Sequence, residues 1–132
     1  MKVLVLICRI LLGLGFVLFG CMGLFLPIHL PPRGIPVGDW LNISHDIGWS
    51  QVVAALQLIG GLLVLLGGTA PFGLCLLCPI TVNIWLFHIL FHATAPSMLL
   101  APVLITVFEL VLLYAYRESF AGVWTTKAKP AL

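Results

Sequence analysis

Apolar residues fill four long stretches of this chain, at residues 3–26, 51–67, 72–93 and 99–116. A helix that crosses a bilayer needs roughly 20 mainly apolar residues, with about 17 to 25 tolerated. Proline and glycine separate the stretches: prolines cluster at 27–36, a glycine turn ending in proline spans 67–71, and Pro96 divides the last two. The pattern predicts an all-α fold, in which residues 1–132 form one domain, a transmembrane four-helix bundle.

Composition supports an integral, multi-pass membrane protein. Of the 132 residues, 62% are hydrophobic and 8% are charged, whereas a soluble domain carries about a quarter charged residues. Most of the surface is therefore expected to face the lipid bilayer. The net charge of +2 is small and dispersed, so nucleic acid is not an expected partner.

The positions of lysine and arginine predict the orientation. Four spans would place both ends of the chain and the 67–71 turn on one side, and cytoplasmic segments are enriched in Lys and Arg. We therefore expect a cytoplasmic tail at 117–132 and an extracytoplasmic loop at 27–50, whose Trp40 and Trp49 suit the membrane interface. In a bacterium the membrane would be the inner one. The residues on the cytoplasmic side would be Lys2, Arg9, Arg117, Lys127 and Lys129, against Arg33 opposite.

Each predicted helix carries one strongly polar side chain well inside its span: Arg9, Gln57, Asn83 and Glu109. Such side chains are costly in hydrocarbon, so we expect them to face the interior and pair. At about 1.5 Å per residue, Arg9 and Glu109 would lie about 10 Å inside the cytoplasmic end, and the two amides about 15 Å. The depths predict an Arg9–Glu109 ion pair and a Gln57–Asn83 contact. Alternatively, Arg9 reaches the headgroups and the amides merely hold helices together.

Cys75 and Cys78 form a C-x-x-C motif, and Pro79 follows directly. One interpretation is a membrane dithiol that exchanges electrons with a quinone. The pair lies near the predicted cytoplasmic side, where thiols are kept reduced, and its neighbours are apolar, which blunts thiol reactivity. We therefore predict that both cysteines act as small apolar packing residues.

His88 and His92 are four residues apart on one predicted helix face and are candidates for ligand contact. This spacing can hold a metal ion if further ligands join, but histidines at a membrane interface are often amphipathic fillers, and we predict no metal site. The sequence offers no Ser-His-Asp arrangement and no phosphate-binding glycine loop. No catalytic residue is predicted.

Several segments together resemble the DoxX-like membrane proteins. They are the early arginine in a glycine-rich first helix (9–20), the stretch from Gln57 to Gly67, the third helix over 79–88 and the ending at 116–120. The resemblance covers nearly the whole chain and implies a four-helix transmembrane bundle. Any site shared with that family should involve Arg9, Gln57, Asn83 and His88.

These observations leave two functional hypotheses. The first is a non-enzymatic membrane protein that binds a small apolar ligand, a lipid or a partner helix within the bundle. Its partner would be another membrane protein or a second copy of the chain. The second, which the resemblance suggests, is the membrane subunit of a quinone-linked system that oxidises thiosulfate or thiols. No cofactor is predicted under the first, and quinone would be the cofactor under the second.

Overall fold

The computed structural model describes residues 1–26, 31–91 and 96–121, with the backbone alone at 96–98. All regular structure in these residues is helical. The helices are α1 (Lys2–Phe25), α2 (Pro36–Asp46), α3 (Trp49–Leu65), α4 (Ala70–Leu90), α5 (Pro96–Ala115) and the short 3₁₀ helix η1 (Arg117–Phe120). The prediction of an all-α fold is confirmed, and the four apolar stretches correspond to α1, α3, α4 and α5 within a few residues.

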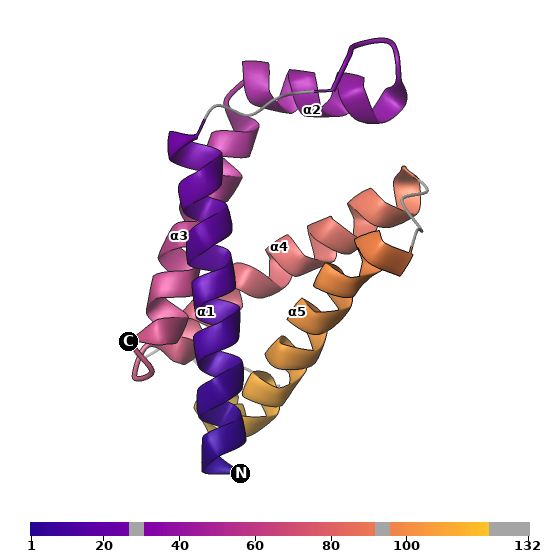
Figure 1. The fold of residues 1–132 in the computed structure, drawn as a ribbon. Helices are drawn as coiled ribbons and strands as arrows, with labels where there is room; N and C mark the ends of the chain where they lie inside the picture. Colours follow the sequence, from indigo (N-terminus) through magenta and orange to yellow (C-terminus); the bar gives the residue numbers. More distant parts are fainter. Residues whose placement is uncertain (27–30, 92–95, 122–132) are drawn as a thin grey trace, which may run out of the picture.

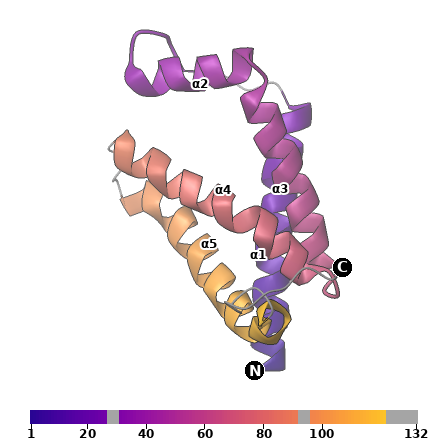
Figure 2. The same ribbon diagram turned by 180° about the vertical axis from the view of Figure 1, so that it is seen from behind.

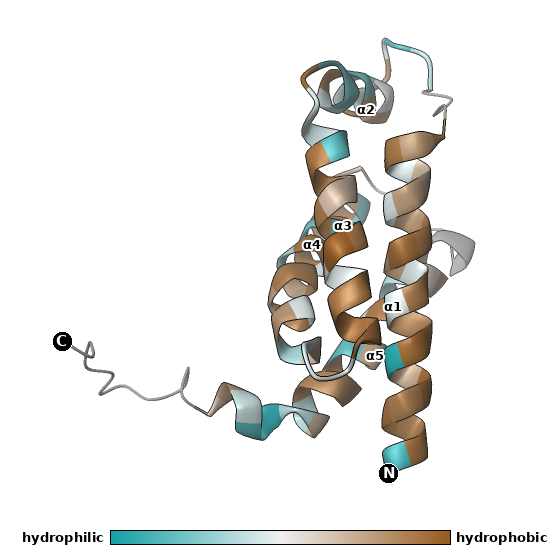
Figure 3. Cartoon of the chain, turned by 90° about the vertical axis from the view of Figure 1, so that its left-hand side faces the viewer, coloured by the Kyte–Doolittle hydropathy of each residue, from teal (hydrophilic) through white to brown (hydrophobic). Residues whose placement is uncertain are grey.

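Two of the described helices, α1 and α4, are by length and composition able to cross a membrane. A third crossing is added if α2 and α3, which meet at a bend of 77°, count as one span. Leu99–Ala115 of α5 is apolar but shorter. Figure 3 shows hydrophilic colour gathering at α2 and at η1, at opposite ends of the apolar helices. Polar residues therefore lie at both ends of the apolar helices.

The prediction that 27–50 is a loop is wrong for residues 36–46, which form α2. Pro36 stands in the first turn, where its missing N–H costs nothing. The Asn42 side chain donates to the carbonyls of Pro31 (2.9 Å) and Gly38 (2.7 Å), which ties the preceding segment to the helix. Gly48 has φ = 78° and makes the turn into α3. This left-handed conformation suits glycine.

Close backbone contact joins α1 to α3. A Cβ added to Gly20 would lie 2.6 Å from the Leu58 backbone nitrogen and 2.7 Å from the Ala54 carbonyl oxygen. Small residues at such crossings let helices approach in an apolar solvent, where van der Waals packing drives association. The two helices lie side by side in Figures 1 and 2.

The core lies in the half of the molecule that contains the N-terminus and the α3–α4 turn. α4 leaves the α1–α3 pair from this turn and runs obliquely to α5, which returns towards the N-terminal end of α1 (Figure 1). At the far end, α2 lies across the molecule (Figure 2). The largest fully buried side chains are Leu12, Phe16, Val64, Leu74, Leu77, Pro102 and Leu112.

Candidate functional site

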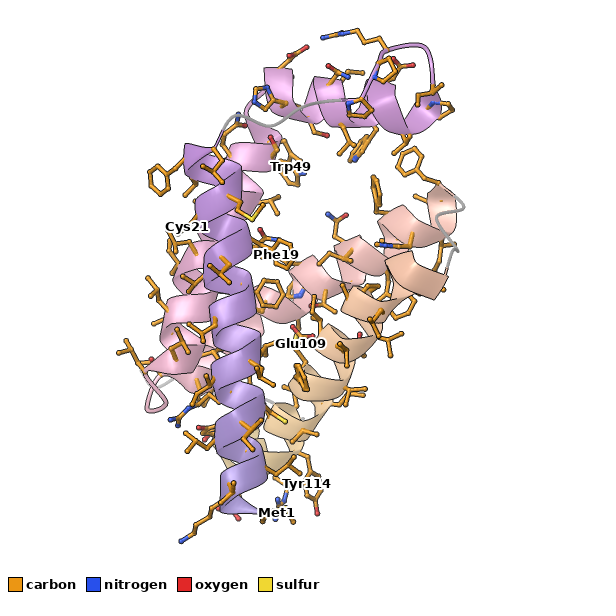
Figure 4. The ribbon with its side chains drawn as sticks, viewed as in Figure 1. Met1, Phe19, Cys21, Trp49, Glu109 and Tyr114 are labelled. Atoms are coloured by element: carbon orange, nitrogen blue, oxygen red, sulfur yellow. The ribbon has the colours of Figure 1, made fainter. Side chains whose placement is uncertain are left out.

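A cavity of about 320 Å³ lies beneath α2, and we call it the outer cavity. Three helices supply its walls, and the α2–α3 bend brings them together by turning α2 over the end of the bundle. Trp49 stands at the first turn of α3, on the inner side of that bend (Figure 4). The lining residues are Trp40, Leu41 and Ser44 from α2, Trp49, Ser50 and Val53 from α3, and Asn83, Ile84, Phe87 and His88 from α4.

Two smaller cavities share walls with the outer cavity. The inner cavity, of about 190 Å³, shares Ile84 and His88 with it and extends to α1 and α5. The side cavity, of about 170 Å³, shares Trp40, Asn83 and Phe87 and extends along α4 to Phe91. The three form a series of neighbouring cavities, linked by shared lining residues, from beneath α2 to α1 and α5. The inner cavity is further lined by Phe16, Phe19, Gln57, Ala101, Pro102 and Ile105.

Aromatic side chains contribute to the walls of all three cavities. Phe19 lies on the side of α1 that faces the inner cavity, whereas Cys21 lies on another face of the same helix (Figure 4). Phe87 packs on Phe91 with ring centroids 4.8 Å apart and meets the His88 ring edge-on at 5.9 Å. The sequence predicts an interfacial position for Trp40 and Trp49, but it does not predict that both line a cavity.

Three of the predicted site residues meet at these cavities. His88 lines both the outer and the inner cavity, Gln57 lines the inner one, and Asn83 lines the outer and side ones. The expected direct contact between Gln57 and Asn83 is not formed, since the described residues show no hydrogen bond between them. Asn83 is exposed rather than turned into the bundle, because α4 diverges from α3 at this level (Figure 1).

The expected ion pair between Arg9 and Glu109 is wrong. Within the described part of the chain the one pair of opposite charges within 4 Å is Arg33–Asp46, on the surface. The Arg9 guanidinium lies against Gly67 in the α3–α4 turn. Equal depth did not bring the residues together, because the Arg9 face of α1 packs on α3, whereas α5 presents Glu109 to α4.

Glu109 instead accepts a hydrogen bond from Thr81 Oγ1, at 2.8 Å. A second polar link lies further along the same helices, where Trp85 Nε1 donates to Thr106 Oγ1 (2.8 Å). Thr106 in turn donates to the Pro102 carbonyl (2.7 Å). Sequence analysis missed both links. Thr81, Trp85 and His88 are spaced four and three residues apart on one face of α4, and this spacing was the available signal.

The C-x-x-C pair lies outside the cavities. Cys75 is exposed on α4 and Cys78 is partly buried, and both are free thiols. Neither lines any of the three cavities. His92 lies outside the described residues, so its predicted contact is not placed. Among the residues that are described, no three His, Cys, Asp or Glu side chains gather as metal ligands would.

Comparisons with models of protein families, with curated proteins and with solved structures find no match to this chain.

Proposed function

We propose that this chain is a DoxX-like membrane protein with four spans, which binds one small amphipathic molecule in the cavities between α2 and α1. In this arrangement α1, α3, α4 and α5 cross the bilayer and α2 lies at its extracytoplasmic surface. Both termini face the cytoplasm. The role is binding rather than catalysis.

The exposed surface of the helices supports the membrane part of the proposal. Large apolar side chains cover the outward faces of α1, α3, α4 and α5, including Leu18, Leu62, Val82 and Leu110. Water would not stabilise so many exposed apolar groups on a monomer, since contiguous patches on soluble proteins rarely exceed a few hundred Å². Lipid chains would cover them without cost.

The observation that carries the binding proposal is the outer cavity and its two neighbours. Ligand sites are clefts of about 300 to 1,000 Å³ with mainly apolar and aromatic walls and few polar groups. The outer cavity, of about 320 Å³, meets this description. Its aromatic side chains and its few polar groups, which include Ser44, Ser50, Asn83 and His88, suit a molecule with a long apolar part and a small polar part.

Native mass spectrometry of the purified protein tests this proposal. We expect the wild type to carry one molecule of a few hundred daltons. Val53→Trp should abolish this adduct by filling the outer cavity, to which Val53 contributes. The matched control is Val52→Trp, because Val52 is the next residue of α3 but faces outwards. Equal adducts in both variants, or none in the wild type, would contradict the proposal.

A further inference from the structure

A fourth cavity extends the series on the side opposite to α2. It measures about 170 Å³, lies between α1 and α5, and shares Phe16, Phe19, Ala101 and Ile105 with the inner cavity. We call it the apolar cavity, because all its lining residues are apolar. Polar groups therefore decrease along the series. The outer cavity has Ser44, Ser50, Asn83 and His88, the inner cavity has Gln57 and His88, and the apolar cavity has none.

This decrease in polar lining residues determines the orientation of a bound amphiphile. Apolar surface leaves water with a gain of roughly 25 cal/mol per Å², and buried polar groups need hydrogen-bond partners. A chain would therefore occupy the apolar cavity, and a polar headgroup would lie at His88, which lines both the inner and the outer cavity.

The hydrogen bond of His88 decides which headgroup this point accepts. His88 Nδ1 lies 2.8 Å from the Ile84 carbonyl oxygen. A carbonyl only accepts, so Nδ1 must carry the proton and act as donor. In the neutral ring Nε2, on the far side from this bond, is then an acceptor. The headgroup beside His88 must therefore donate a hydrogen bond.

The charge of the residues that line the cavities limits which headgroups can bind. No Lys, Arg, Asp or Glu lines the outer, side, inner or apolar cavity in the part of the chain that is described. A phosphate or carboxylate headgroup would enter the bundle without a cation, at a high desolvation cost. An ammonium would likewise have no carboxylate. The headgroup is therefore uncharged.

We infer that the ligand is a neutral lipid with a hydroxyl headgroup, whose O–H donates to His88 Nε2 and accepts from the Gln57 amide. This inference rests on the proposed function and names the ligand class of the same cavities. A hydroxyl fits because its oxygen can donate to the His88 acceptor and at the same time accept from the Gln57 amide N–H. Its chain runs between α1 and α5.

Three probes with the same 18-carbon chain test the headgroup: monoolein, methyl oleate and oleate. Monoolein has hydroxyls, methyl oleate keeps the ester without them, and oleate carries a charge. Native mass spectrometry of the detergent-purified full chain would follow the fraction of protein with one bound probe. We expect monoolein to bind about tenfold more tightly than the other two, which corresponds to about 1.4 kcal/mol.

Each other outcome is decisive. Equal binding of monoolein and methyl oleate would overturn the headgroup assignment and leave the proposed function standing. Tightest binding of oleate would overturn the requirement for a neutral headgroup. Failure of all three probes to bind would overturn the ligand class in a wild type that carries another adduct, and the proposed function itself in a wild type that carries none.

Variants at His88 test whether this residue causes the preference for monoolein over methyl oleate. His88→Phe keeps a ring but removes the acceptor, and should weaken monoolein about tenfold while leaving methyl oleate unchanged. His88→Gln keeps an acceptor and should restore part of the preference. If His88→Phe retains the wild-type preference for monoolein, His88 does not recognise the headgroup. If the variant does not fold, the wild-type probe series still decides the inference.

Discussion

Thr81 Oγ1 donates a hydrogen bond of 2.8 Å to Glu109 Oε1, and this bond joins α4 to α5. Both residues are buried, and Glu109 is 5% exposed. The carboxyl group thus has a partner on the neighbouring helix. Nearer α2, the Trp85–Thr106 bond makes a second link between the same helices. The two bonds hold the α4–α5 pair that forms one wall of the cavities.

Thr81→Val should therefore lower the free energy of unfolding by about 0.6 to 2 kcal/mol, since valine keeps the shape of threonine and removes the donor. Thermal unfolding in detergent, followed by far-UV circular dichroism, measures the loss. Thr81→Ser is the control, because it keeps the hydroxyl and should stay closer to the wild type. Equal losses in the two variants would show that the bond does not contribute.

Arg9 and Glu109 should behave as independent residues. Arg9→Leu and Glu109→Leu each remove a charge, but the two residues make no contact, so their effects on unfolding should add within about 0.5 kcal/mol. The Arg9 side chain lies at the α3–α4 turn instead. A double variant that regains much of the stability lost by the single ones would show that the two charges interact after all.

Gly20 should tolerate no side chain, in contrast to Gly15 on the same helix. A Cβ on Gly20 would meet α3 backbone atoms within 2.7 Å, whereas a Cβ on Gly15 has nothing within 4 Å. Gly20→Ala should destabilise the protein by about 1 to 3 kcal/mol, the usual cost of overpacking. Gly15→Ala should be neutral or slightly stabilising. Urea or SDS unfolding of the two variants compares them directly, and equal behaviour would contradict the close α1–α3 contact.

Orientation can be measured with single cysteines in a variant whose four native cysteines are replaced by alanine. Ile47→Cys lies beside α2 at a side chain that is 72% exposed. Glu118→Cys lies on η1, at a side chain that is also exposed. A membrane-impermeant maleimide added to intact cells should label residue 47 and spare residue 118 until the cells are opened. The reverse labelling would invert the topology.

Apolar length and turn residues were enough to predict the long helices, because a span must satisfy its backbone internally. They were not enough for α2, whose 11 residues are too polar and too short to resemble a span. The sequence features that favour this helix are local: Pro36 stands at its start, and Asp39 lies in its first turn. The orientation of this helix depends on the left-handed Gly48, which hydropathy does not report.

The site could be predicted in part. Periodicity and depth identified the polar residues, and His88, Gln57 and Asn83 do meet at neighbouring cavities. The partner of each could not be predicted, because helical spacing shows which face a residue occupies and not which helix lies opposite. Glu109 therefore accepts a hydrogen bond from Thr81 rather than pairing with Arg9, and the Arg9 side chain lies against the turn at Gly67. The cavities themselves depend on the divergence of α4 from α3, which is a property of the packing.

Photolabelling tests binding inside the bundle most directly. The probe is a monoolein analogue with a diazirine near the middle of its chain, bound to the wild-type protein and mapped by peptide mass spectrometry. We predict that label falls on residues of the inner and apolar cavities and decreases in the presence of excess unlabelled monoolein. The lining residues of these cavities that are buried or partly buried in the bundle include Phe16 and Ile105. Label spread over outward-facing side chains such as Leu18, Leu62 and Val103, and unchanged by the competitor, would contradict the account.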